Sequence, residues 1–214
     1  MTADAAPVDR RAALKARHRE AILDAADALI GERGSADFGV DDLAARADVA
    51  RRTVFNHFAS LDDVVMTACS RLLTRTVEEF GDATAATPAG DGTPAALFAE
   101  LTDAMRGIDL PSVVSYLWGV LGDLDGGPRS HHLIDEVFTR CVDELSAEMV
   151  ARSTDSDGLE SQILVSSLVN GIAVLAGRWI EDTGAVVDAS TRATWDALFD
   201  RLVATVRHGY APTV

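Results

Sequence analysis

Hydrophobic residues recur at helical spacing in almost every segment of this chain. Intervals of three and four residues place them on one face of each predicted helix, and no run alternates apolar and β-branched residues with polar ones as a strand would. The pattern therefore predicts an all-α fold of about nine helices. The expected helices are residues 12–31, 40–47, 51–58, a long one from 61, 94–106, 110–124, 128–152, 158–181 and 190–208.

Small and polar residues between the periodic segments predict where helices begin and end. Residues 81–94 contain Gly, Ala, Thr, Asp and Pro without apolar periodicity, so we expect an irregular connection there. Thr93 followed by Pro94 predicts an N-cap and the first residue of the next helix. Ser60 is expected to cap the long helix that follows it.

The last two predicted helices carry more apolar surface than one chain is expected to bury. Residues 158–181 hold two adjacent apolar stripes, one with Leu168 and Trp179 and the other with Val165 and Val169. Such a helix is covered on two sides. Because residues 190–208 repeat the pattern, we expect these two helices to form a homodimer interface.

Charge is distributed unevenly along the sequence. The formal net charge of −15 disfavours nucleic acid if it is taken as one number. Residues 1–60, however, hold nine Lys/Arg and ten Asp/Glu, a net of −1, which leaves −14 for residues 61–214. Residues 10–19 hold five cations, one histidine and no acid, and such a segment attracts phosphate groups.

Segments that would direct the chain into or across a membrane are not expected. No apolar stretch follows the N-terminal basic residues, and the most apolar window, 163–177, contains Ser166 and Asn170 and is shorter than the roughly 20 residues that span a bilayer. We expect a buried helix there and a cytoplasmic protein. Cys69 and Cys141 occupy apolar helical positions, so buried reduced thiols are favoured over a disulfide or a redox sensor.

A short helix, a tight turn and a second short helix are predicted between residues 40 and 58, the organisation of a helix-turn-helix. Leu43, Val54 and Phe58 are spaced to face a core, and Ala44 is small where two helices cross. The side chains left outside are Arg51, Arg52, Thr53, Asn56 and His57. Arg and Asn make bidentate contacts with guanine and adenine, whereas Thr and His suit phosphate oxygens. An ordinary pair of helices with a solvated face is the alternative interpretation.

This segment closely resembles the DNA-binding domain of the TetR family of regulators over about residues 17 to 66. The resemblance rests on the first helix, the break at Gly34, residues 49–58 and Ser60. It implies an all-α homodimer whose paired third helices enter successive major grooves of a near-palindromic operator, and which a ligand in the C-terminal domain releases. The expected parts are a basic arm (1–16), a helix-turn-helix domain (17–60) and a ligand-sensing and dimerisation domain (61–214).

Several positions depart from the family pattern. Gly39 and Ala50 stand where the family usually has Thr or Ser as helix caps, and Asp48 replaces a turn glycine. Leu61 and Phe55 replace a lysine and a tyrosine that commonly contact phosphates. The resemblance thus implies weakened phosphate anchoring.

Basic residues of the first helix are expected to compensate for these losses. Arg17, Arg19 and the preceding arm are close in sequence to the domain, and the arm is expected to reach the minor groove. The DNA-contacting residues that we predict are Arg17, Arg19, Arg46, Arg51, Arg52, Thr53, Phe55, Asn56 and His57.

Large side chains on the later helices are candidates for a ligand site, because those helices surround a cavity in the fold that the chain resembles. The candidates are Phe98, Met105, Tyr116, Trp118, Phe138 and Trp179. Aromatic walls with few polar groups suit small apolar ligands. Tyr116 and Trp118 are favoured because each adds a polar tip to an apolar helix. The alternative is that most of these residues belong to the core.

Metal and enzyme signatures are weak or missing. His131, His132, Asp135 and Glu136 include helical spacings that suit a metal ion, but a solvated helix start explains the acids equally well, so no metal or cofactor is expected. The sequence has no Gly-x-Ser-x-Gly, Walker, Cys-x-x-Cys or His-Glu-x-x-His motif. Ligand-responsive repression without catalysis is therefore the leading hypothesis. A helical small-molecule-binding dimer without sequence-specific DNA binding, and an all-α hydrolase or lyase, remain alternatives.

Overall fold

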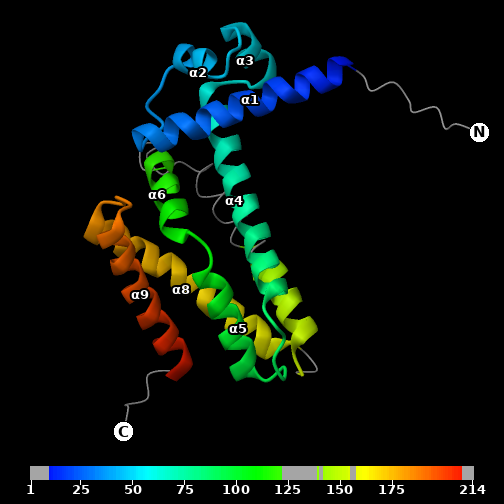
Figure 1. The fold of residues 1–214 in the computed structure, drawn as a ribbon, viewed down its shortest axis with the longest axis vertical. Helices are drawn as coiled ribbons and strands as arrows, with labels where there is room; N and C mark the ends of the chain where they lie inside the picture. The colour runs from blue at the N-terminus through cyan, green and yellow to red at the C-terminus, as the bar shows by residue number, and fades with distance from the viewer. Residues whose placement is uncertain (1–9, 122–138, 140–141, 155–157, 209–214) are drawn as a thin grey trace, which may run out of the picture. The chain divides into compact units, whose positions relative to one another are not determined.

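The computed structural model describes residues 10–121, 139, 142–154 and 158–208. The helices in these residues are α1 (Arg10–Arg33), α2 (Val40–Arg46), α3 (Arg51–His57), α4 (Leu61–Ala86), α5 (Pro94–Arg106), α6 (Leu110–Leu121), α8 (Leu159–Thr183) and α9 (Ala189–His208) (Figure 1). Residues 142–152 are helical as well, and no strand occurs in the part described. The all-α prediction is confirmed. The chain divides into two compact units, Met1–Cys69 and Ser70–Val214, and the boundary falls within α4.

The first unit is built on apolar faces that the sequence predicts. Helices α1, α2 and α3 pack against one another. Ile22 and Ile30 of α1, Leu43 of α2 and Val54 of α3 are nearly inaccessible to solvent. Helix α1 begins at Arg10. The basic residues of 10–19 are therefore helical and belong to the same helix as the buried Ile22 and Ile30.

Side-chain caps begin two of the longer helices. The Asp63 amide donates to Ser60 Oγ (3.1 Å), and the Ala59 amide donates to the Asp63 carboxylate (2.9 Å), a reciprocal arrangement that satisfies two backbone donors. At α5 the Ala96 amide donates to Thr93 Oγ1 (3.3 Å), and Pro94 occupies the first turn. Both predicted caps are confirmed.

Helix α4 extends to Ala86, which corrects the irregular connection predicted from residue 81. Ala is the best helix former and needs no apolar periodicity to remain helical. Thr84 in this turn is fully buried, and Thr87 Oγ1 donates to the Ala83 carbonyl (2.9 Å) just beyond the helix end. Residues 81–86 contain no large apolar side chain, but they still belong to α4.

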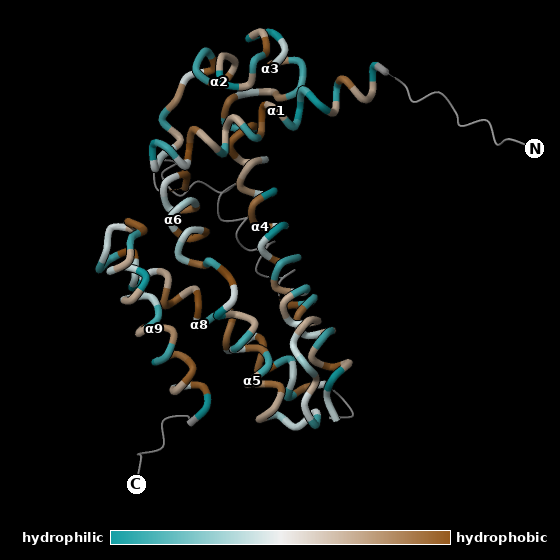
Figure 2. The backbone as a smooth tube through the Cα atoms, viewed as in Figure 1, coloured by the Kyte–Doolittle hydropathy of each residue, from teal (hydrophilic) through white to brown (hydrophobic). Residues whose placement is uncertain are grey.

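Helices α8 and α9 form the central contact of the second unit, and apolar residues recur along α8 (Figure 2). The Trp179 and Trp195 rings meet edge to face at 5.7 Å, and Trp179 Nε1 donates to the Thr191 carbonyl (2.8 Å). A Cβ at Gly171 would lie 2.2 Å from a Leu202 methyl, so glycine permits the close approach of the two helices. Helix α8 also packs against α5 and α6.

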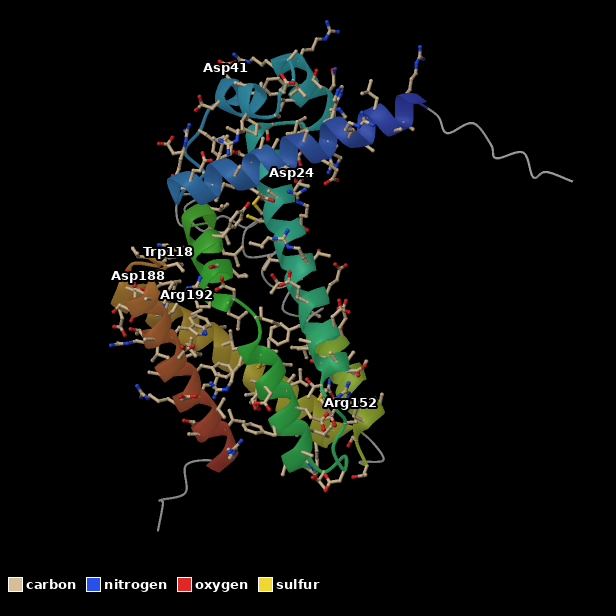
Figure 3. The ribbon with its side chains drawn as sticks, in the orientation of Figure 1. Asp24, Asp41, Trp118, Arg152, Asp188 and Arg192 are labelled. Carbon is tan, nitrogen blue, oxygen red and sulfur yellow. The ribbon has the colours of Figure 1, made fainter. Side chains whose placement is uncertain are left out.

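Exposed ion pairs tie α9 to the connection before α6 and to α5. Arg192, labelled near the start of α9 in Figure 3, donates to both oxygens of Asp109 (2.5 and 3.0 Å). Arg106 of α5 donates to Asp200 of α9 (2.6 Å). The hydrogen bond from Arg192 lowers the pKa of Asp109. Because these side chains are about half exposed, each pair contributes little free energy and mainly fixes orientation.

By length and composition alone, α8 is the one described helix that could cross a membrane. In this structure it makes the contacts of a core helix, with Val165, Leu168 and Trp179 all fully buried.

A buried ion pair joins α5 to residues 142–152. Arg152 donates to Glu100 (3.0 Å), to Glu148 (2.9 Å) and to the Thr87 carbonyl (3.0 Å), while the other Glu100 oxygen accepts from the Gly90 amide (2.6 Å). The Arg152 and Glu100 side chains are only 11% and 7% exposed. These contacts hold the connection before α5 in place.

Replacing Arg152 with Met should lower the free energy of unfolding by about 3 kcal/mol, because it leaves the Glu100 carboxylate buried without its cation. Arg178→Met is the matched control: its pair with Asp182 is exposed, so we expect a loss below about 1 kcal/mol. Denaturant unfolding of the two variants makes the comparison. Equal losses would show that the Arg152 pair is not a structural anchor.

Candidate DNA-binding and ligand-binding sites

Helix α3 presents most of its polar side chains to solvent. Val54 and the following Phe58 are buried and fix which face of the helix turns inward. Arg51, Arg52, Phe55 and Asn56 are exposed, and Thr53 and His57 are half-buried. The structure therefore brings together, on one seven-residue helix, six of the nine predicted DNA-contacting residues.

The turn between α2 and α3 carries the departures that the sequence shows. Asp48 adopts a left-handed conformation (φ +50°), which costs a non-glycine residue about 1 kcal/mol. Gly39 and Ala50 cap α2 and α3 without a side-chain hydrogen bond. The turn is closed instead by the backbone, where the Val49 amide donates to the Ala44 carbonyl (3.0 Å).

Two of the predicted DNA-contacting arginines are held by carboxylates, which the sequence analysis did not anticipate. Arg46 of α2 donates through both terminal nitrogens to Glu32 (2.5 and 3.1 Å), and this hydrogen bond lowers the pKa of Glu32. Arg51 lies 3.2 Å from the carboxylate of Asp41, which Figure 3 labels on α2. Both pairs are exposed and exchange readily for other partners.

Basic residues of α1 lie beside the C-terminal end of α3. The His18 and His57 rings meet edge to face at 6.1 Å, and the Arg19 guanidinium lies 4.4 Å above the Phe58 ring and 3.4 Å from the His57 carbonyl. Burial lowers the pKa of His57, and the charges of Lys15, His18 and Arg19 lower it further. An anion bound here would offset that repulsion. Arg17 is exposed on the same helix.

These features are those of a known family. The family model for "Bacterial regulatory proteins, tetR family" matches residues 22–65, which contain the helix-turn-helix just described. Residues 22–65 of the chain therefore carry the DNA-binding domain of the TetR family. No curated protein matches it.

Solved structures show that the TetR fold extends over the rest of the chain. A TetR-family regulator from Mesorhizobium loti has a TM-score of 0.66 at 15% identity, with 89% of this chain and 97% of that one covered. A TetR-family regulator from Streptomyces coelicolor has a TM-score of 0.54 at 19% identity, covering 89% and 96%. FadR from Bacillus subtilis, solved with stearoyl-CoA, has a TM-score of 0.51 at 14% identity, covering 86% and 97%.

The second unit contains an apolar cavity of about 450 Å³ between α4, α5, α6 and α8. The described residues that line it are Leu73, Thr76, Val77, Phe80, Met105, Leu110, Val113, Val114, Leu117, Trp118, Leu121, Val169, Ile172, Ala173, Ala176, Gly177 and Ile180. None of these lining side chains is charged. The Thr76 hydroxyl donates to the Leu72 carbonyl (3.0 Å), so its proton is already used.

The predicted ligand residues separate into several groups. Met105 and Trp118 line this cavity. Trp179 does not, because its ring is engaged by Trp195 in the α8–α9 contact. Tyr116 is half-buried on α6 and is not among the lining residues, and Phe98 lines a different pocket. Phe138 lies outside the described residues.

Most of the cavity wall consists of aliphatic residues, which a search for aromatic side chains missed. Leu73, Val77 and Phe80 follow one another at intervals of four and three residues on α4, opposite Val169 and Ile172 of α8. Their helical stripe is visible in the sequence, but Phe80 and Val169 also belong to the core, and only the structure shows where such stripes leave space between them.

The metal and thiol candidates of the sequence lie partly outside the described residues. Among the described residues no three His, Cys, Asp or Glu side chains form a metal-binding group. His131, His132, Asp135, Glu136 and Cys141 lie outside those residues. Cys69 is buried, and burial raises the pKa of its thiol to about 12, so the predicted buried reduced thiol is confirmed there.

Proposed function

We propose that this chain is a ligand-responsive DNA-binding repressor that a small molecule releases from a near-palindromic operator. The observation that carries the proposal is α3, whose apolar side holds it in the first unit while Arg52 and Asn56 remain exposed. Residues four apart share one face of a helix, so both side chains can reach the same groove. We assign Arg52 to guanine and Asn56 to adenine edges.

The remaining predicted DNA contacts are assigned to the phosphate backbone. Thr53 and His57 flank the base-reading face, and Arg19 lies beside His57 on α1, as the distances above support. Arg17, Arg46, Arg51 and Phe55 complete the proposed surface. Arg46 and Arg51 would exchange Glu32 and Asp41 for phosphate oxygens.

Those two ion pairs also favour a second candidate function. If Glu32 and Asp41 keep their arginines, and α2 and α3 lack side-chain caps, the unit presents few free phosphate anchors. The chain would then be a helical small-molecule-binding dimer without sequence-specific DNA binding.

A homodimer through α8 and α9 accounts for apolar surface that the second unit leaves open. On α8, Ile163 is 57% and Val174 is 75% exposed. They are eleven residues apart, close to three helical turns, so they lie on the same face. Exposed aliphatic residues aligned on one face favour a two-fold interface.

The cavity favours an uncharged apolar effector. The described residues of its wall offer no charged partner, and burying an ion against them would be costly. Effector binding would favour one arrangement of the dimer over another, which releases DNA without any reaction of the effector.

Selection of random duplex DNA on the purified chain tests DNA reading. We expect an enriched palindrome. Arg52→Gln and Asn56→Ala should relax base preference at defined positions by about 1–3 kcal/mol each, whereas His57→Gln should weaken all sequences alike. Arg75→Gln, at an exposed position of α4 in the second unit, is the matched control and should change nothing. Failure to enrich any motif would favour the second candidate function.

Introducing a charge into the proposed dimer face should dissociate the dimer. Val174→Glu is expected to give a monomer in sedimentation velocity, because an unpaired carboxylate would be buried in the interface. Val186→Glu alters an equally apolar, 57% exposed residue between α8 and α9 and should leave the dimer intact. A monomeric parent chain would contradict the proposed interface.

Filling the apolar cavity should abolish effector binding. Binding of the neutral probe 1-aminoanthracene should alter Trp118 fluorescence, since Trp118 lines the cavity. Ala173→Trp, which occupies the space, should reduce its affinity by about tenfold or more, whereas Ala193→Trp, at an exposed position of α9, should not. Unchanged affinity in Ala173→Trp would place the probe elsewhere.

A further inference from the structure

A second pocket, of about 580 Å³, lies in the same unit as the apolar cavity and shares no lining residue with it. It is formed where α5 and α8 begin and α9 ends, and Leu97, Phe98, Ser161, Leu164 and Arg207 contribute to its wall. Residues 160–164 of α8 line this pocket, whereas residues 169–180 of the same helix line the cavity. The midpoints of these two stretches are roughly 18 Å apart along the helix axis. Figure 3 places Arg152, whose neighbour Ser153 lines the pocket, at the opposite end of the unit from Trp118.

The pocket differs from the cavity in its electrostatics. Two helix N-termini border it, those of α5 and α8, and each carries roughly half a positive charge. The Arg207 guanidinium and the Glu160 carboxylate contribute opposite unit charges. Arg207 is thus the cation that the described wall offers to an anionic ligand.

A buried hydroxyl in the wall has no partner of its own. Ser161 is 1% exposed, and its Oγ makes no hydrogen bond among the described residues. Leaving a buried hydroxyl unpaired is unfavourable. Rotation of this short side chain to another staggered position offers the hydroxyl to a molecule in the pocket that it lines.

Apart from Ser153, the remaining described residues of the wall are apolar, and several contacts fix the backbone around them. The Arg207 guanidinium lies 5.1 Å from the Phe98 ring centre, so a cation stands beside an aromatic surface. Ser153 follows the buried Arg152 pair, and the Thr154 amide donates to the Gly92 carbonyl (3.1 Å). A Cβ at Gly92, whose φ is +72°, would meet the Arg152 carbonyl at 2.7 Å, so glycine permits this close contact. Walls fixed in advance lower the cost of ordering a ligand site.

We propose that this pocket binds a small monocarboxylate with an apolar body. The carboxylate lies between Arg207 and Ser161, and the apolar body packs on Phe98 and Leu164. This second site requires neither DNA binding nor occupation of the apolar cavity. Glu160 at the rim disfavours ligands that carry two negative charges.

Calorimetric titration of the full chain with 3-phenylpropionate tests the site, with neutral 3-phenylpropanamide as the comparison ligand. The acid should bind about tenfold or more tightly than the amide, because a charge-assisted hydrogen bond is lost with the amide. Arg207→Gln should weaken the acid by a similar factor. Arg106→Gln should not: its guanidinium also lies over an aromatic ring, 4.9 Å from that of Phe199, but outside the pocket.

Two further variants separate this site from a structural effect and from the apolar cavity. Ser161→Ala should weaken the acid several-fold yet keep or raise the unfolding temperature, since it removes an unpaired buried hydroxyl. Ala173→Trp, which fills the cavity, should leave acid binding unchanged. The proposal is overturned if the acid does not bind, if acid and amide bind equally, or if Ala173→Trp abolishes binding while Arg207→Gln does not. None of these outcomes depends on whether the chain binds DNA.

Discussion

Helix α8 is apolar around most of its circumference, and the organisation of the second unit follows from the need to cover it. Gly171 lets α9 approach closely on one side, where Trp179 and Trp195 complete the contact. Helices α5 and α6 cover other parts of α8, but they do not fill the space beside Val169 and its neighbours. The same helix thus supplies the core, one wall of the apolar cavity and the open face that we assign to a second copy.

The first unit has a different constraint. A small fold needs many buried residues, yet one of its surfaces has to stay exposed to bind an anion. Val54 of α3 and Phe58 just after it face inward, which leaves Arg51, Arg52, Phe55 and Asn56 exposed on this seven-residue helix. The turn before it holds Asp48 in a left-handed conformation and relies on backbone hydrogen bonds. The missing side-chain caps of α2 and α3 and the left-handed Asp48 are unfavourable for stability. They lie where the predicted DNA-contact surface begins. Such departures are common at functional sites, because a binding surface is not chosen for stability.

Sequence reasoning succeeded where one local rule decided the outcome. The caps at Ser60 and Thr93 and the buried Leu43 and Val54 follow from residue type and helical period alone. It failed where a residue far away in the sequence determines the contact that a side chain makes. The Arg46–Glu32 pair joins residues fourteen positions apart, and no local pattern indicates it. The predicted end of α4, before residue 81, was also wrong, because Ala-rich turns extend a helix without apolar periodicity.

The cavity shows the same limit. Large aromatic side chains are visible in a sequence, but empty space is a property of how helices fail to meet. Trp118 lines the cavity while Trp179 fills the core, although each is an indole on an apolar helix. Trp179 is buried against Trp195 and donates to the Thr191 carbonyl, whereas Trp118 is half exposed.

The carboxylates that hold Arg46 and Arg51 have a consequence for the ions around any complex with DNA. An arginine that moves onto a phosphate displaces a condensed cation from the DNA, but Glu32 or Asp41, left behind, attracts a cation in turn. The net number of ions released is then smaller than the number of arginines engaged. A binding surface built in this way loses affinity with rising salt less steeply than its content of basic residues indicates.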